Sequence, residues 1–358
     1  MEKTENNLNW PILGNEHIVE FLSKSLKDGR VFGTYIFSGP DDLGKTTVAK
    51  YFAYSMLCQK NDSSKASVEI KKLPCGECTT CRQNKVGQAL TTEDDNFMGV
   101  HPDLHIIKRE KDKKNISIDQ VRSLIHSLSM SSFLNSYKIG IIKNAESLND
   151  ESANALLKTL EEPKNKVIII LITSDAEALP ATILSRSQLL RFRPVKTDLI
   201  YDYLIKTFGT SRVTARNLAR LSLGRPALAV KFLENKDFYE SYLKRVSVFL
   251  NFSTKDINER FLMIEELLGT KITGQETVKL AKRIIEVWQG VARDLILANY
   301  GQHDLIQHEM MDQELIREKA KLTIPVLLSL SEKLSQADKY LKANVNPKLV
   351  LEGVAISF

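Results

Sequence analysis

The stretch YIFSGPDDLGKTTVAKYFAYSML, residues 35–57, contains the most specific structural motif of this 358-residue chain. It begins with four residues typical of a strand, continues with the pattern GxxxxGK[ST] at residues 39–46, and ends in a helix-forming run. Glycines in such a loop let backbone N–H groups converge on a phosphate, and the start of the following helix adds a partial positive charge. The stretch therefore predicts a nucleotide-binding loop between a strand and a helix.

Side chains of this loop have separate expected roles. Lys45 can reach the β- and γ-phosphates of a nucleotide, and the Thr46 hydroxyl can hold Mg²⁺. The residues expected to contact nucleotide are Gly39, Pro40, Asp41, Asp42, Leu43, Gly44, Lys45, Thr46 and Thr47. ATP or ADP is the ligand that the pattern allows. Two alternatives stay open: a chance match, and a motif kept in a site that the fold occludes.

Hydrolysis needs more than this loop. A working phosphate-loop ATPase holds Mg²⁺ with an acidic residue at the end of a neighbouring strand, and a second acid orients water. The strand expected at residues 138–142 ends instead in Lys143 and Asn144. Neither side chain can do this, and we expect Glu146 to turn away from the loop. The sequence thus predicts nucleotide binding without efficient hydrolysis, with Mg²⁺ binding in doubt, unless Glu146 or Asp150 substitutes.

Outward from this stretch, strand-like and helix-like segments alternate through the first half of the chain. The expected strands are short and apolar on both faces, at residues 35–38, 104–107, 138–142, 167–172 and 189–192. The expected helices lie at residues 17–27, 45–58, 118–129 and 151–162. Alternation of this kind predicts an α/β fold with a parallel, doubly wound sheet.

The pattern changes after Pro194, where strand-like segments stop. Three short helices are expected first, at residues 198–208, 213–221 and 226–234. Further helices are then expected at residues 261–268, 276–299, 304–322 and 326–343, where apolar residues recur every three to four positions. The second half is therefore expected to be helical throughout.

Four cysteines lie close together in the sequence. Cys75, Cys78 and Cys81 form a CxxCxxC run, and Cys58 ends the helix after the phosphate loop. Four thiolates are the set that a closed, tetrahedral zinc site takes, and no ligand position is left for a substrate. We expect structural Zn²⁺ here; four unrelated small core residues are the alternative.

Composition places the chain among ordinary globular proteins. Hydrophobic residues make up 43% and charged residues 26%, and the net charge of +6 permits contact with nucleic acid without arguing for it. No apolar run approaches the ~18 residues of a membrane span. The first ten residues, MEKTENNLNW, lack a signal-peptide pattern. A cytoplasmic protein without membrane contact is expected.

Several further motifs carry a family resemblance. The sequence resembles bacterial clamp-loader subunits of the AAA+ family in NALLKTLEEP at residues 154–163 and in LPATILSRS at residues 179–187. Shorter landmarks are WPILG at 10–14, HPD at 101–103 and IDQVR at 118–122. The resemblance covers the expected first domain, residues 1–194, and, more loosely, the expected second domain, residues 195–237. The expected last domain, residues 238–358, matches only in length and helical character.

The resemblance implies roles that spacing alone does not. Arg186 corresponds to the family's arginine finger, which reaches the ATP of a neighbouring subunit and stabilises charge on the transferring phosphoryl group. This chain has Ser187 where the family usually has Cys, a change that leaves the finger itself intact. A salt-bridged surface arginine is the alternative. Thr173 or Ser174 corresponds to the first sensor, and Arg225 to the second sensor or to a plain helix-start arginine.

The resemblance also implies an architecture and partners. The expected domains are a RecA-like AAA+ domain at residues 1–194 with a zinc-binding insertion at about 58–100, a helical lid at 195–237, and a helical collar at 238–358. The implied partners are gamma/tau and delta subunits in a hetero-pentamer, the sliding clamp and, through the complex, primer–template DNA of the DNA polymerase III system.

Two rival functions are kept open. One is an active ATPase of the gamma/tau type, which the missing strand-end acid disfavours. The other is a zinc-containing AAA+ regulator that binds nucleic acid, which predicts tight, steeply salt-dependent DNA binding by the isolated chain.

Overall fold

A computed structural model describes residues 10–61, 73–84, 101–110, 113–132, 137–162, 166–269, 274–319 and 321–358. Residues 1–9 and most of the predicted insertion at 58–100 lie outside the described residues. The chain forms two compact units, one of residues 1–199 with Arg225–Ala227, the other of Ile200–Gly224 with Leu228–Phe358. The subdivision of the second half into lid and collar stays a prediction.

The first unit is built on a five-stranded sheet in the order β2-β3-β4-β1-β5, and every ladder is parallel. The strands are β1 (Thr34–Ser38), β2 (Leu104–Ile107), β3 (Lys138–Lys143), β4 (Val167–Thr173) and β5 (Gln188–Arg191). All five agree with the expected strands to within one residue at either end. The predicted parallel α/β fold is confirmed.

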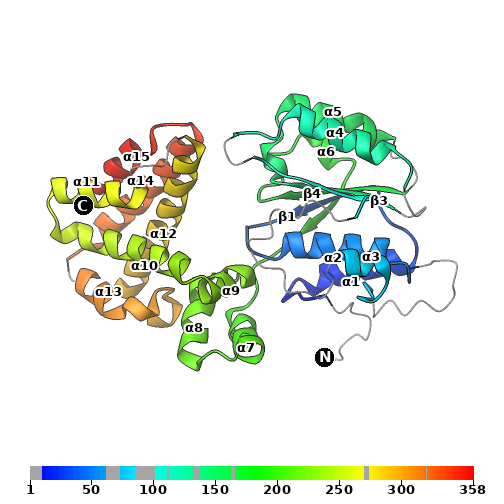
Figure 1. Cartoon of the computed structure of the whole chain (residues 1–358). Coiled ribbons are helices and arrows are strands. Elements are labelled where there is room, and N and C mark those ends of the chain that lie inside the picture. Colours follow the sequence, from blue (N-terminus) through cyan, green and yellow to red (C-terminus); the bar gives the residue numbers. More distant parts are fainter. Residues whose placement is uncertain are drawn as a thin grey trace. The chain divides into compact units, whose positions relative to one another are not determined.

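Helices cover both faces of this sheet (Figure 1). On one face lie α1 (Glu16–Lys27), α2 (Lys45–Leu57) and α3 (Thr79–Gln83), and on the other α4 (Ile118–Ser129), α5 (Asp150–Glu161) and α6 (Ala181–Leu184). Side chains of a strand alternate between the faces, so two apolar cores result. Tyr35 and Phe37 belong to the core beneath α1 and α2, whereas Ile36 belongs to the other core.

The second unit contains only helices among its described residues. They are α7 (Thr197–Phe208, from Ile200), α8 (Arg212–Leu221), α9 (Pro226–Glu234), α10 (Lys236–Asn251), η4 (Phe252–Thr254), α11 (Ile257–Leu268), α12 (Gln275–Asn299), η5 (His303–Leu305), η6 (Glu309–Met311), α13 (Asp312–Lys319), α14 (Ile324–Lys342) and α15 (Pro347–Ala355). Trp288 of α12 is fully buried, with its ring 5.3 Å from that of Phe252. α12 forms the centre of this helical unit.

The prediction of a single helix at residues 304–322 is wrong. The chain there forms η5, η6 and the shorter α13. The cause is Asp294 on α12, which is fully buried and accepts hydrogen bonds from the backbone N–H groups of Gln307 at 2.9 Å and His308 at 2.8 Å. Inside an α-helix these N–H groups would bond to carbonyls four residues earlier. The ring of His308 joins the same carboxylate at 2.7 Å and the Tyr242 hydroxyl at 2.8 Å.

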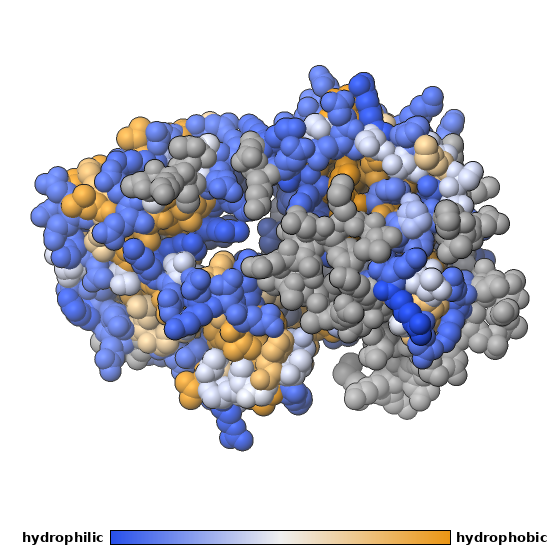
Figure 2. Space-filling model, in the orientation of Figure 1, coloured by the Kyte–Doolittle hydropathy of each residue, from blue (hydrophilic) through white to orange (hydrophobic). Residues whose placement is uncertain are grey.

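Hydrophilic residues, shown in blue, dominate the described surface on the face seen in Figure 2, and apolar residues form smaller orange patches on both units. Within the described part of the chain, no helix combines the length and apolar character that a membrane crossing requires.

Candidate nucleotide and metal sites

Helix α2 connects the two sites that the sequence predicts. The phosphate loop lies immediately before its first residue, and Cys58 follows its last. Both sites therefore depend on the packing of this helix, of which Val48, Ala49, Phe52 and Ala53 are completely buried.

The phosphate loop begins at the end of a central strand. Ser38 of β1 lies opposite Thr173 of β4. The next residue, Gly39, has φ of 144°, and a Cβ there would lie 2.5 Å from the carbonyl oxygen of Phe192. Only glycine fits this close approach. Gly44, with φ of 86°, ends the loop and precedes α2. The loop thus has the backbone that the sequence pattern requires.

Lys45 is engaged within its own loop. Its side chain is 5% exposed, and its ammonium donates to the carbonyl oxygens of Gly39 and Pro40, the latter at 2.8 Å, and lies 3.5 Å from the Asp41 carboxylate. Burial lowers the pKa of Lys45, and the Asp41 carboxylate opposes that shift. An ammonium group has three N–H donors, and each has a partner here. A bound phosphate would have to replace some of these contacts.

The end of β3 carries no acid: Lys143 is its last residue, and Asn144 follows in a left-handed conformation with φ of 57°. The expectation that Glu146 turns away from the loop stays a prediction. The Glu146 carboxylate accepts a hydrogen bond from the backbone N–H of Ser174 at 3.3 Å, and its charge favours the protonated form of Lys45. Asn144, in its left-handed conformation, precedes the short 3-10 helix that carries Glu146.

The two candidate sensors occupy different surroundings. Thr173 is 1% exposed, and its hydroxyl donates to the Asp175 carbonyl at 2.7 Å. Arg225 belongs to the short segment that clusters with the first unit, and Ala227 of this segment donates from its backbone N–H to the Asp42 carbonyl at 3.1 Å. The segment that carries Arg225 therefore contacts the phosphate loop. Both sensor roles stay predictions.

Arg186 lies just beyond α6, with 38% of its side chain exposed. Its guanidinium forms an ion pair with Glu161 at 3.0 Å and donates to the Thr182 carbonyl at 3.1 Å. A partly exposed pair of this kind contributes at most about 1 kcal/mol. The neighbouring Ser187 hydroxyl donates back to the Ile183 carbonyl at 2.7 Å. The arginine is thus oriented but accessible, and its role as a finger stays a prediction.

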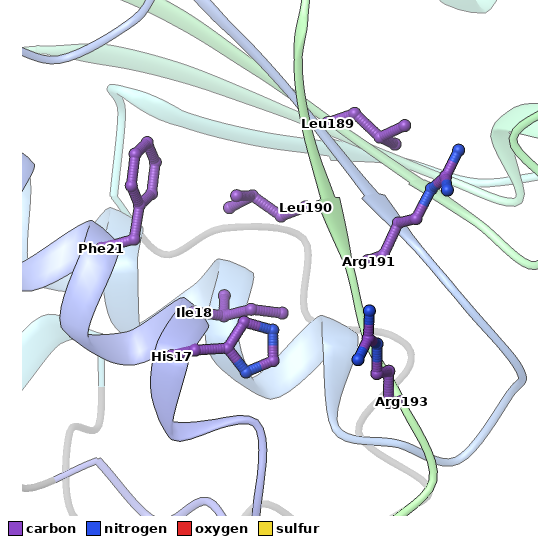
Figure 3. A pocket seen from close by; sticks show the side chains of 7 residues that line it. All are labelled: His17, Ile18, Phe21, Leu189, Leu190, Arg191 and Arg193. Carbon is purple, nitrogen blue, oxygen red and sulfur yellow. The ribbon is translucent and has the colours of Figure 1, made fainter.

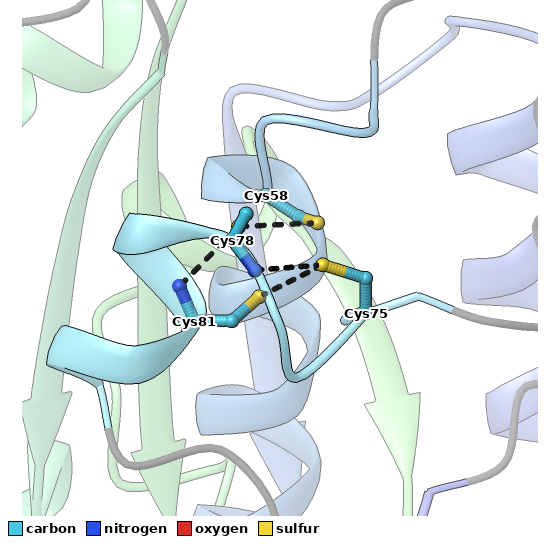
Figure 4. Close-up of side chains that lie close together, drawn as sticks. All are labelled: Cys58, Cys75, Cys78 and Cys81. Carbon is cyan, nitrogen blue, oxygen red and sulfur yellow. Dashed lines mark hydrogen bonds between the residues drawn. The ribbon is translucent and has the colours of Figure 1, made fainter.

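The four cysteines converge as their spacing predicts (Figure 4). All four sulfur atoms lie within 4.8 Å of one another. Cys58 Sγ is 3.9 Å from Cys78 Sγ, and Cys75 Sγ is 3.8 Å from Cys81 Sγ. Zn–S bonds of ~2.3 Å in a tetrahedron place neighbouring sulfurs ~3.8 Å apart. A disulfide needs ~2.05 Å. The cluster is therefore compatible with a structural zinc site.

The local backbone supports this geometry. Gly76, with φ of 73°, allows the tight turn after Cys75. The backbone N–H of Cys78 donates to Cys75 Sγ and that of Cys81 to Cys78 Sγ, both at 3.4 Å. Such bonds stabilise thiolates. A hydrogen bond from Cys81 is the largest cause that lowers the pKa of Cys58, to about 5. The same contact, together with burial, raises the pKa of Cys81.

Three contacts in and around these sites were not predicted from the sequence. The Asp41–Lys45 pair has the i, i+4 spacing of a helical ion pair and could have been found from it. The Glu161–Arg186 pair and the Glu146–Ser174 contact join residues far apart along the chain. No pattern within one segment of the sequence predicts them.

Several known proteins are similar to this chain in sequence. Residues 14–196 match the model of the family described as DNA polymerase III, delta subunit. The chain is 25% identical over 341 residues to the delta' subunit of DNA polymerase III of Bacillus subtilis, covering 95% of this chain and 94% of that protein.

It is also 30% identical over 216 residues to the tau/gamma subunit of Haemophilus influenzae, which covers 60% of this chain but only 28% of that longer protein. Among solved structures, a gamma-subunit-related protein of Thermotoga maritima aligns with 94% of this chain and 97% of that one, at 17% identity and a TM-score of 0.48.

Proposed function

The chain belongs to the DNA polymerase III delta-subunit family of clamp-loader proteins, and from this premise we propose that it acts as the delta-prime-type subunit. In this role it assembles with gamma/tau and delta subunits and helps to place a sliding clamp on primed DNA. It donates Arg186 to the nucleotide of a neighbouring subunit and does not itself turn over ATP.

One observation carries this proposal: the phosphate loop is intact, but β3 of the same sheet ends in Lys143 and is followed by Asn144. Without a carboxylate at this position the loop can bind a nucleotide, but Mg²⁺ and the attacking water lack their usual anchor. Arg186 supports the second half of the proposal, because its guanidinium is oriented by Glu161 and Thr182 yet 38% exposed. A finger must be both ordered and accessible.

A second candidate, an active gamma/tau-type ATPase, is favoured by one electrostatic interaction. The charge of Glu146 favours the protonated form of Lys45, and Glu146 could substitute for the missing acid. Steady ATP turnover by the isolated chain, lost in both Lys45→Ala and Glu146→Gln, would establish this candidate and overturn the first.

Clamp loading tests the proposed function. Purified gamma/tau and delta subunits, a sliding clamp and primed circular DNA are combined with or without this chain, and clamp retained on the circles is measured. Loading that depends on this chain is the expected result. Failure of the chain to enter the complex, or loading that is equally efficient without it, contradicts the proposal.

A further inference from the structure

The free edge of the sheet in the first unit borders a pocket of ≈ 370 Å³ between β5 and α1 (Figure 3). Ile18, Phe21 and Leu190 form its apolar wall, Arg191 and Arg193 contribute its cationic groups, and His17 also lines it. These residues lie in two segments far apart in sequence that only the sheet topology brings together.

The apolar wall is well ordered by packing. Ile18 is 1% exposed and Leu190 is 7% exposed. Phe21 is partly buried and stacks on Phe32, with ring centroids 6.3 Å apart. One face of the Phe21 ring is therefore already covered, while the pocket between Phe21 and Leu190 is open to an aliphatic or aromatic side chain.

The two arginines have no acidic partner within the part of the chain that the structure describes. Arg191 and Arg193 are both exposed, and the described residues that line the pocket include no Asp or Glu. Among the described residues, neither guanidinium forms an ion pair or a side-chain hydrogen bond. Figure 3 shows Leu190 on the α1 side of β5 and Arg191 on the opposite side of the strand. Leu190 and Arg191 thus lie on opposite faces of β5, and Leu189, which also lines the pocket, lies on the Arg191 side.

The backbone of β5 is also available on this side. In the described part of the chain, β5 pairs only with β1 and ends the sheet. Just beyond the strand, the N–H of Phe192 points toward β1, where it donates to the Ser38 carbonyl at 2.7 Å. Arg193 points the other way: its N–H donates to Asn15 Oδ1 at 2.7 Å, and its carbonyl accepts from Asn15 Nδ2 at 3.1 Å.

These two bonds are those that a neighbouring strand would make. Backbone groups of alternate residues in a strand point to the same side. The N–H and C=O groups of Leu189 and Arg191 therefore face the same free edge as those of Arg193. Asn15 closes one end of this edge and leaves the rest open.

We propose that this edge binds an extended acidic–apolar segment of a partner protein, which adds a strand to β5. Successive side chains of an added strand point to opposite faces. Apolar residues of the segment enter the pocket beside Phe21 and Leu190, and its carboxylates contact Arg191 and Arg193. A segment with alternating apolar and acidic residues satisfies both sides at once.

Peptide is favoured over nucleic acid by the same features. A free strand edge and an apolar wall match a polypeptide backbone and its side chains, whereas a nucleic-acid surface needs a longer run of phosphate-binding cations. The exposed arginines also discourage pairing with neutral or basic strands, which protects the edge from aggregation and gives selectivity. The inference depends neither on nucleotide binding nor on Arg186.

Fluorescence anisotropy with the full chain tests the proposal. The probe is a dye-labelled ten-residue peptide of alternating leucine and aspartate. Its references are a peptide of the same composition with leucines and aspartates in separate blocks, and a peptide with lysine in place of aspartate. We expect binding of the alternating peptide that weakens at least about tenfold in the double variant Arg191→Ser, Arg193→Ser, because two charge-assisted contacts are lost. Arg212→Ser, an exposed arginine on α8, is the matched control and should leave binding unchanged.

N-methylation of the peptide distinguishes strand addition from loose charge attraction. Methyl groups on one set of alternate amides should abolish binding, and on the other set should be tolerated, because only one set faces β5. Equal affinity for the alternating and the block peptides, or no effect of the double variant, overturns the proposal. Displacement of the peptide by an equal concentration of a single-stranded oligonucleotide also overturns it, and assigns the surface to nucleic acid instead.

Discussion

The two ends of α2 carry sites of different completeness. At its carboxyl end, Cys58 joins three further cysteines, and all four ligands of the predicted metal lie within 4.8 Å of one another. At its amino end, Lys45 contacts groups of its own loop, and β3, separated from β1 by β4, ends without an acid. The first site needs only a metal ion. The second holds the groups that bind phosphate but lacks the group that would organise hydrolysis.

This difference teaches how far a local motif determines function. A closed metal site is complete when its four ligands are present in one short region. A nucleotide site draws on several strands and, in assemblies, on several subunits.

The cysteine cluster should act as a structural element. Cys81→Ser removes a completely buried ligand, so we expect loss of stoichiometric zinc and a fall of at least about 2 kcal/mol in the free energy of unfolding. Metal analysis and denaturant unfolding measure the two effects. Glu77 lies between the ligands Cys75 and Cys78 in the sequence and is exposed. Its variant Glu77→Gln is the control and should retain the metal. A Cys81→Ser protein with unchanged stability would reduce the cluster to four packed thiols.

Zinc affinity should rise steeply with pH. The pKa of Cys58 is lowered to about 5, so this thiol is ionised at neutral pH. The pKa of Cys75 is raised mainly by burial, and the pKa of Cys81 is raised mainly by its contact with Cys58. Zinc must displace at least the protons of Cys75 and Cys81, so affinity should change about 100-fold per pH unit near neutrality. Competition with a chromogenic chelator between pH 6 and 8 measures this slope. A flat profile would mean that the ligands are already ionised.

Nucleotide affinity should respond to the acid inside the phosphate loop. Asp41 lies 3.5 Å from the Lys45 ammonium, where it competes with an incoming phosphate. Asp41→Asn should therefore strengthen binding of a fluorescent ADP analogue about 2- to 5-fold, the range expected for one partly exposed charge pair. Asp42→Asn is the matched control, with a smaller effect. Weaker binding in Asp41→Asn would instead indicate that Asp41 holds a cation beside the nucleotide.

Regular periodicity explains what could be predicted. The apolar runs and the GxxxxGK[ST] spacing contain enough information for the five strands, their parallel direction and the phosphate loop. The CxxCxxC run does the same for the metal cluster. In these regions neighbouring residues determine the local structure, so the sequence pattern and the fold agree.

Contacts between distant residues explain what could not be predicted. The helix expected at residues 304–322 is broken because Asp294 captures two backbone N–H groups. The Glu146 carboxylate accepts a hydrogen bond from the backbone of Ser174, a residue far along the chain. The pocket beside β5 depends on the meeting of Phe21 and Leu190 across the fold. None of these has a signature within one segment.

The most direct test of the account compares Arg186→Ala with Lys45→Ala, each placed in this chain within the same reconstituted complex. ATP turnover is measured with gamma/tau, delta, sliding clamp and primed DNA. A finger contributes about 10³-fold or more in related phosphoryl-transfer enzymes, so we predict a large loss of turnover at the neighbouring site for Arg186→Ala and nearly unchanged turnover for Lys45→Ala. The opposite result, turnover that survives Arg186→Ala and falls with Lys45→Ala, would make this chain an ATPase in its own right and contradict the account.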